Sequence, residues 1–443
     1  MRDLGETTLT NFTRIPEELD KFLEARRTLL IKGYAGTGKT TLALEILQRA
    51  GLPDCIYFST RVPPTVLYEH YPWLRDKVVL GPEEMRFLET RQETPEQLLN
   101  RLRDQLLKME RPFLVVDTWD AMAAEMDVKE RMRTAKAILA TPYMTGGATI
   151  LVEENGENSY LDFLADGVVL LTLTEVYGEA EEGRVYEDHL EKRTVREIEL
   201  KKLRGMKISN RKYIFTLEGG KFRVFPTFYE DLGIKPDIIN DLQGGSISSG
   251  IPDFDVITGG FKRGSFNLFE VEHGVDLRYM QLQTQIAWNA VGNGRGVIVV
   301  PSMGEKYPAE LTREVVTHLP NSKDFESEVE YIKELCKRRF SEEQFRKGLM
   351  IFLGFDTIAN RYGYDSVLAI AERTINFAQE NGAVVIGTMK RGIKHLSYMT
   401  HVADTHFVFK DVANALTVYG MRPKTGLYAV DLIDNRVRLI PIV

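Results

Sequence analysis

The sequence has 443 residues, of which 43% are hydrophobic and 27% charged, a size and composition that suit two or three globular domains. No apolar run reaches membrane-spanning length, the N-terminus lacks the apolar core of a signal peptide, and two cysteines cannot form a disulfide framework. These features predict a cytoplasmic protein without a membrane partner. The formal net charge of −7 gives no overall attraction to nucleic acid, so we do not expect a nucleic-acid partner.

The first informative stretch begins after a short predicted helix at 15–23, where an apolar run at 28–31 leads into a glycine-rich loop. The residues of this stretch are Gly33, Tyr34, Ala35, Gly36, Thr37, Gly38, Lys39, Thr40 and Thr41, and apolar residues with helical spacing follow at 42–47. Strand, glycine loop and helix in this order predict a P-loop, whose backbone N–H groups and helix N-terminus bind phosphate. We expect Lys39 to bind the β- and γ-phosphates of a nucleoside triphosphate and Thr40 to bind Mg²⁺.

The second informative stretch is 113–118, where four apolar residues end in Asp117. A carboxylate at the carboxyl end of a buried parallel strand lies at the edge where α/β sheets bind ligands. We therefore expect Asp117 to support the Mg²⁺ ion, as in a Walker B strand. Between the two motifs, 55–59 is predicted as a buried strand and 66–110 as mainly helical.

Further along, the pattern predicts a helix at 128–140, strands at 148–154 and 163–171, and a solvated β-hairpin in the charged stretch 174–204, with its turn at 179–183. Proline, glycine and serine then accumulate around 226–247. We predict a first domain at 1–226, a linker at 227–247 and a second domain at 248–443.

The second half repeats the order of the first, which indicates an internal duplication. Segment 352–357 aligns with 113–118 position for position, and apolar runs at 265–269, 384–388 and 402–409 align with the other predicted strands. At 271–278, however, Leu277 stands where the first half has its P-loop lysine, and Glu272 and Asp276 bring negative charge that only Arg278 offsets. We expect one nucleotide site per chain.

These motifs resemble the KaiC-like branch of the RecA superfamily, including a segment at 248–265 that opens such domains. The intact first P-loop, the stretch 58–64 and the degenerate second half look most like the archaeal gas-vesicle regulator group (GvpD-type). The resemblance implies two tandem RecA-like P-loop NTPase domains of the α/β class, each a mainly parallel sheet flanked by helices. It also implies ATP binding and a homo-oligomer, usually a hexameric ring, in which Lys202 and Arg204 of the Lys-x-Arg-Gly segment reach the phosphates of the adjacent subunit.

One departure concerns hydrolysis, since such ATPases carry an acidic residue just after the strand that follows the P-loop helix. Here the corresponding residues are Ser59, Thr60 and Arg61, which orient or deprotonate a water less well than a carboxylate. We favour Glu154 as the catalytic base, with Glu153 and Asp120 as alternatives, and expect slow hydrolysis.

The sequence leaves open a second class of function, a regulatory interaction protein that binds ATP to change its assembly and has negligible turnover. A motor on DNA is disfavoured by the acidic charge, and autokinase activity by the lost P-loop of the second domain. The basic clusters at 333–339 and 390–395 are predicted to be solvated faces, and the regulatory protein partner is not identified by the sequence.

Overall fold

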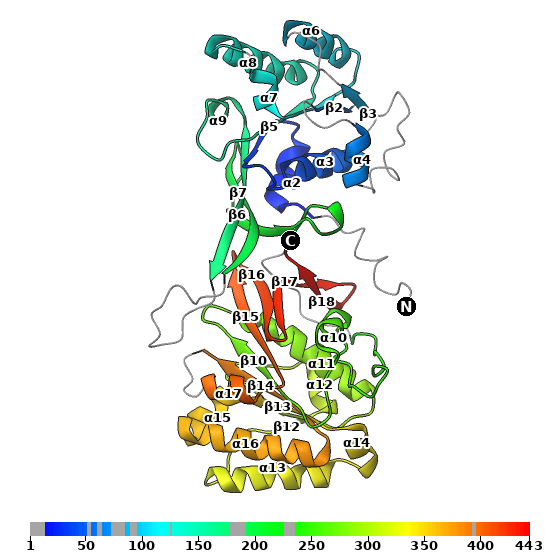
Figure 1. Cartoon of the computed structure of the whole chain (residues 1–443), viewed down its shortest axis with the longest axis vertical. Coiled ribbons are helices and arrows are strands. Elements are labelled where there is room, and N and C mark those ends of the chain that lie inside the picture. The colour runs from blue at the N-terminus through cyan, green and yellow to red at the C-terminus, as the bar shows by residue number, and fades with distance from the viewer. Residues whose placement is uncertain are drawn as a thin grey trace. The chain divides into compact units, whose positions relative to one another are not determined.

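The computed structural model describes residues 14–50, 55–59, 64–71, 85–88, 95–124, 126–177, 192–225, 235–391 and 396–443. The chain divides into two compact units, one comprising 1–225 with the last two residues and the other 226–441 (Figure 1). Within the described ranges each unit has one nine-stranded sheet. The predicted turn at 179–183, Thr60 and Arg61, the first part of the linker and residues 392–395 lie outside these ranges.

In the first unit the sheet order is β3-β2-β4-β5-β1-β6-β7-β8-β9, parallel from β3 to β6 and antiparallel beyond it. Its strands are β1 (Thr28–Gly33), β2 (Cys55–Ser59), β3 (Met85–Leu88), β4 (Phe113–Asp117), β5 (Ala148–Glu153), β6 (Gly167–Tyr177), β7 (Lys192–Leu203), β8 (Lys212–Thr216) and β9 (Arg223–Val224). Its helices are α2 (Glu17–Glu24), α3 (Lys39–Ala50), α4 (Pro64–His70), α6 (Pro95–Leu106), α7 (Trp119–Ala123), α8 (Val128–Met144) and α9 (Leu161–Leu164), with a 3₁₀ turn, η2 (Glu218–Gly220).

The central strands of this sheet are continuous apolar runs because both faces are covered. Successive side chains alternate between the faces, so Leu29 and Ile31 pack in one core with α3, while Leu30 packs in a second core with α7 and α8. The prediction that 66–110 is mainly helical was wrong at 85–88, where β3 pairs with β2 at the sheet edge. A four-residue strand within charged sequence is too short for its period to be recognised.

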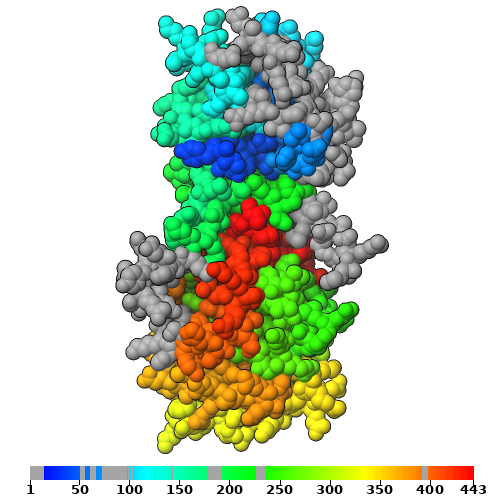
Figure 2. Space-filling view, in the orientation of Figure 1, coloured from blue at the N-terminus to red at the C-terminus, as the bar shows by residue number. Residues whose placement is uncertain are grey.

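The second unit has the equivalent strand order, β12-β11-β13-β14-β10-β15-β16-β17-β18. Its strands are β10 (Phe266–Val271), β11 (Val297–Val300), β12 (Val316–Thr317), β13 (Met350–Gly354), β14 (Val384–Lys390), β15 (Thr405–Val412), β16 (Ala415–Arg422), β17 (Lys424–Ile433) and β18 (Arg436–Pro441). Its helices are α10 (Pro252–Thr258), α11 (Met280–Gly292), α12 (Ala309–Glu314), α13 (Phe325–Arg339), α14 (Glu342–Lys347), α15 (Phe355–Tyr362), α16 (Tyr364–Asn381) and α17 (Leu396–Val402), with a 3₁₀ turn, η3 (Leu277–Tyr279). The yellow and orange segments of Figure 2, which include α13 and α16, lie together on one side of this unit.

The two sheets therefore share one topology, and the prediction of two α/β domains with mainly parallel sheets flanked by helices is confirmed. The predicted alignment of 352–357 with 113–118 is shifted by two residues. In the first unit Asp117 and Ile31 both pair with Val152, and Ile31 lies two residues before the end of β1 at Gly33. In the second unit Gly354 and Phe269 both pair with Thr388, and Phe269 lies two residues before the end of β10 at Val271. The equivalent of Asp117 is thus Gly354, and Asp356 lies inside α15. Among the described residues, no helix is long and apolar enough to cross a membrane.

Candidate nucleotide-binding site

The predicted P-loop connects β1 to α3, with α3 beginning at Lys39. Three of its glycines have left-handed or similarly positive φ values, +152° at Gly33, +78° at Gly36 and +101° at Gly38. A Cβ at Gly33 would lie 2.5 Å from the carbonyl oxygen of Leu171, whereas one at Gly36 would meet nothing within 4 Å. The loop is thus tightly fixed where it leaves the strand and open at Gly36, so a phosphate can approach the backbone there.

The loop lysine is buried and folds back over the loop. Lys39 Nζ donates to the carbonyl oxygen of Tyr34 at 2.7 Å, and the Thr37 hydroxyl donates to the same oxygen at 2.8 Å. Tyr34 and Ala35 are exposed, and the Tyr34 ring lies beside Gly156, in the loop that follows β5. Further into α3, the Thr41 hydroxyl lies 2.9 Å from that of Tyr71. The ammonium of Lys39 is therefore held at the phosphate loop, where it can neutralise an incoming anion.

The structure brings Thr40 and Asp117 into direct contact. The Thr40 hydroxyl donates to Asp117 Oδ2 at 2.7 Å, and the hydroxyl of Tyr57 on β2 donates to the same oxygen at 2.5 Å. Burial raises the pKa of Asp117, while these two hydrogen bonds and the charge of Lys39 partly oppose the rise. Two hard oxygen donors next to a phosphate loop fit Mg²⁺, which takes one or two protein oxygens and completes its shell with phosphate and water.

Three carboxylates near the ends of β4 and β5 were candidates for the catalytic base. The backbone N–H of Glu154 donates to Asp120 Oδ2 at 2.5 Å, and the negative charge of Glu154 adds to the rise in the pKa of Asp117. Glu153 is buried, accepts a hydrogen bond from Ser159 at 3.0 Å and lies 3.7 Å from Lys32 Nζ. Burial raises the pKa of Glu153 to about 7. Glu153 thus belongs to a buried ion cluster, whereas the half-buried Glu154 lies near the predicted metal ligand.

Lys202 and Arg204 lie near the amino end of β1, whereas the P-loop follows its carboxyl end. Gly167 pairs with Leu29, the second residue of β1, and with Leu203, while the P-loop leaves β1 at Gly33. Four residues of strand separate these two levels by about 13 Å. Lys202 donates to the carbonyl oxygens of Asp162 and Ala165 at 2.8 and 2.6 Å.

Arg204 forms an ion pair with Asp166 at 2.8 Å, yet its side chain is 61% exposed. Burial, together with the charge of Arg204, lowers the pKa of Lys202. The structure therefore does not bring these two cations together with the P-loop of the same chain.

Two contacts of the site were missed by the sequence reasoning. Tyr57 was read only as part of a buried strand, although its hydroxyl binds Asp117. Arg196 on β7 donates to the carbonyl oxygen of Gly36 at 2.7 Å, because β7 lies next to β6, which pairs with β1 at the level of the loop. A polar group inside an apolar strand was the available signal for Tyr57, and no local signal marks Arg196.

The charged residues of the corresponding loop in the second unit are paired with other residues of that unit. Glu272 is buried, and its carboxylate accepts from Lys410 at 2.5 Å, from Tyr419 at 3.1 Å and from Arg391 at 3.3 Å. Arg278 binds Asp276 at 2.7 Å and Asp411 at 2.6 Å. The charge of Glu272 is thus paired within the protein, with Lys410 of β15, Tyr419 of β16 and Arg391 directly after β14.

Comparison with known proteins agrees with this geometry. A family model described as an ATPase, KaiC, matches residues 13–228, which include the P-loop and Asp117. Protein GvpD2 of Halobacterium salinarum is 28% identical over 479 aligned positions, covering 94% of this chain and 93% of GvpD2. Protein GvpD1 of the same organism is 30% identical over 326 positions, covering 67% of this chain and 58% of GvpD1.

Proposed function

Because the chain belongs to the KaiC-like/GvpD-type group, we propose that its first unit binds ATP with Mg²⁺ and hydrolyses it slowly. One observation carries the proposal. Thr40 and Asp117, which come from separate elements and are 77 positions apart, share a hydrogen bond directly beside an open phosphate loop. Such a contact prepares two oxygen ligands for the cation that accompanies a nucleoside triphosphate.

Each residue of the site then has a role that follows from its position. The loop N–H groups from Gly33 to Thr41 bind the phosphates, and Lys39 exchanges its contact with Tyr34 for the β- and γ-phosphates. Thr40 and Asp117 would hold Mg²⁺, which supplies neutralisation of the phosphate charge. Glu154 orients the attacking water. We favour Glu154 over Glu153 for this role because the carboxylate of Glu153 already contacts Lys32 and Ser159.

The positions of Lys202 and Arg204 favour action across a subunit boundary. They lie at the end of the parallel strands opposite to their own P-loop, and Arg204 is largely exposed. A neighbouring subunit in a ring, hexameric in KaiC-like proteins, would bring that arginine to the phosphates, where a cation stabilises the charge of the transition state. We propose a cytoplasmic archaeal regulator of this kind, acting on a protein partner.

The second candidate is an assembly switch that binds ATP without turnover. It is favoured by one sequence observation, the missing carboxylate after β2, although Thr60 and Arg61 lie outside the described residues. In that case ATP binding would change the oligomer, and Lys202 and Arg204 would act as anchors between subunits.

Turnover of ATP with Mg²⁺ by the full chain, measured together with oligomer size, separates the two candidates. We expect turnover in a ring-sized particle, its loss in Lys39→Ala and Arg204→Ala, and a strong decrease in Glu154→Gln. Arg211→Ala is the matched control, since Arg211 is also an exposed arginine of this unit. Normal turnover in Glu154→Gln would refute the assigned base, whereas tight ATP binding and altered oligomer size without turnover would establish the switch.

A further inference from the structure

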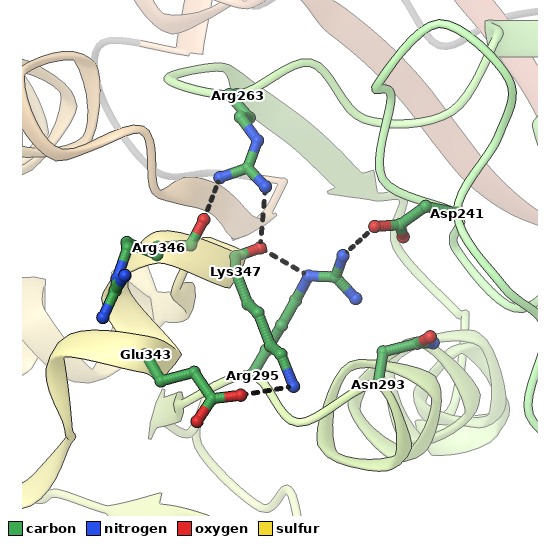
Figure 3. A pocket seen from close by; sticks show the side chains of 7 residues that line it. All are labelled: Asp241, Arg263, Asn293, Arg295, Glu343, Arg346 and Lys347. Carbon is green, nitrogen blue, oxygen red and sulfur yellow. Dashed lines mark hydrogen bonds and ion pairs between the residues drawn. The ribbon is translucent and has the colours of Figure 1, made fainter.

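The second unit contains a pocket of about 520 Å³ whose lining is almost entirely charged (Figure 3). The lining residues are Asp241, Arg263, Asn293, Arg295, Glu343, Arg346 and Lys347. Four basic side chains against two acidic ones leave a formal excess of two positive charges. A concave surface of this volume can enclose a small-molecule ligand, and its charge favours an anion.

This pocket is separate from the degenerate nucleotide loop of the same unit. Arg263 precedes β10, Arg295 precedes β11 and Lys347 precedes β13, so the pocket lies at the amino ends of these parallel strands. The loop 271–278 follows β10 at its carboxyl end. The pocket therefore lies at the opposite edge of the sheet from the place where a P-loop would be.

Part of the positive charge has a structural role. Arg263 donates to the carbonyl oxygens of Arg346 and Lys347 at 2.9 and 3.2 Å, and Arg295 Nε donates to that of Lys347 at 3.0 Å (Figure 3). These three hydrogen bonds satisfy carbonyls at the end of α14, which the helix itself leaves unpaired. Arg295 also forms an ion pair with Asp241, and Lys347 forms one with Glu343 at 3.2 Å.

Capping of α14 does not use all the hydrogen-bond donors of Arg295. The residue is only 4% exposed, and its Nη1 has no hydrogen-bond partner among the described residues. A buried guanidinium N–H without an acceptor costs free energy that an anionic ligand would recover. Arg346, an exposed residue at the rim, adds a second cation whose side chain is not used in the helix cap.

We propose that this pocket binds a small, multiply charged phosphate compound. Arg295 Nη1 and the guanidinium of Arg346 would donate to its phosphate oxygens, because guanidinium groups form strong, directional hydrogen bonds with phosphate. Lys347 adds positive charge, which Glu343 reduces in the free protein. Several cations around one buried donor favour a group with more than one negative charge over a single carboxylate.

The test is calorimetric titration of the full chain with inorganic pyrophosphate at fixed ionic strength. The protein carries Lys39→Ala, so that the P-loop of the first unit does not dominate the signal. We expect one-to-one binding that Arg346→Ala weakens about tenfold, the effect of one lost charged hydrogen bond. Glu343→Gln should instead tighten binding by about two- to fivefold, because it removes a like charge and frees Lys347.

The matched control is Lys323→Ala, which removes an exposed positive charge of the same unit outside the pocket. Arg346→Ala and Glu343→Gln change exposed side chains, so both variants are expected to fold. The proposal is overturned by an absence of binding, by equal weakening in Lys323→Ala and Arg346→Ala, or by unchanged affinity in Arg346→Ala. Equal affinity for citrate would overturn the assignment to phosphate.

Discussion

Replacing Asp117 with asparagine separates support of the cation from the architecture of the site. In the nucleotide-free protein the change removes the charge from two hydrogen bonds, from Tyr57 and Thr40, a loss of about 1 kcal/mol each. It also removes a carboxylate whose burial raises its pKa, which offsets part of that loss. We therefore expect the free energy of unfolding to change by less than about 2 kcal/mol without ligand.

With Mg²⁺ and ATP the difference should be much larger. Ligand at a hundredfold excess over Kd stabilises the wild-type protein by about 2.7 kcal/mol, and binding weakened tenfold to hundredfold leaves about 0.4–1.4 kcal/mol. For a unit of this size 1 kcal/mol shifts Tm by about 2–4 °C. Thermal melts with ATP plus EDTA and with ATP plus Mg²⁺ measure the increment due to the cation, which Asp117→Asn should abolish.

Asp127→Asn is the control for this experiment. Asp127 accepts the N–H of Glu130 at the start of α8 at 2.8 Å, a role that asparagine also performs. The Asp127→Asn variant should show the same increase in Tm on addition of Mg²⁺ as the wild-type protein. If Asp117→Asn also retained that increment in full, Asp117 would not support the cation, and the reasoning from its contact with Thr40 would be refuted.

Two further predictions concern stability. Gly33→Ala should destabilise the first unit by more than about 3 kcal/mol, because the added Cβ meets a backbone carbonyl. Gly36→Ala has free space around its Cβ and should cost only about 1–2 kcal/mol of backbone strain. Equal losses of stability in denaturant titrations would contradict this reasoning. Glu328 is buried in the second unit, and hydrogen bonds from Tyr362, His318 and the backbone N–H of Ser322 outweigh burial and lower its pKa to about 2. The stability that Glu328 contributes is thus present above the unfolded pKa of 4.5 and is lost as pH falls toward 2. In urea unfolding, Glu328→Gln should therefore lower the free energy of unfolding by about 2–3 kcal/mol at pH 7 and by little near pH 2. A loss of stability that does not depend on pH would exclude the pKa shift as its cause.

Local pattern was sufficient for some parts of the fold and not for others. The strand–glycine–helix order and the apolar run ending in Asp117 have a period and a spacing that a sequence displays directly. The contact of Arg196 with Gly36 depends on β6 lying between β1 and β7, and lateral strand order leaves no trace in a single segment. The two-residue shift between Asp117 and Asp356 has a similar origin, because register is set by pairing with the neighbouring strand.

The second unit shows why loss of the P-loop need not cost the fold. In the first unit, the loop that follows β1 holds Lys39 against the carbonyl oxygen of Tyr34. In the second, Glu272 is buried among Lys410, Tyr419 and Arg391, and Arg278 is bound to Asp276 and Asp411. Breaking one partner of such a buried pair leaves an uncompensated charge, which is strongly destabilising. A lysine at position 277 would therefore restore one residue of the motif but not the site, since the ion pairs of the neighbouring residues hold this loop in its present arrangement.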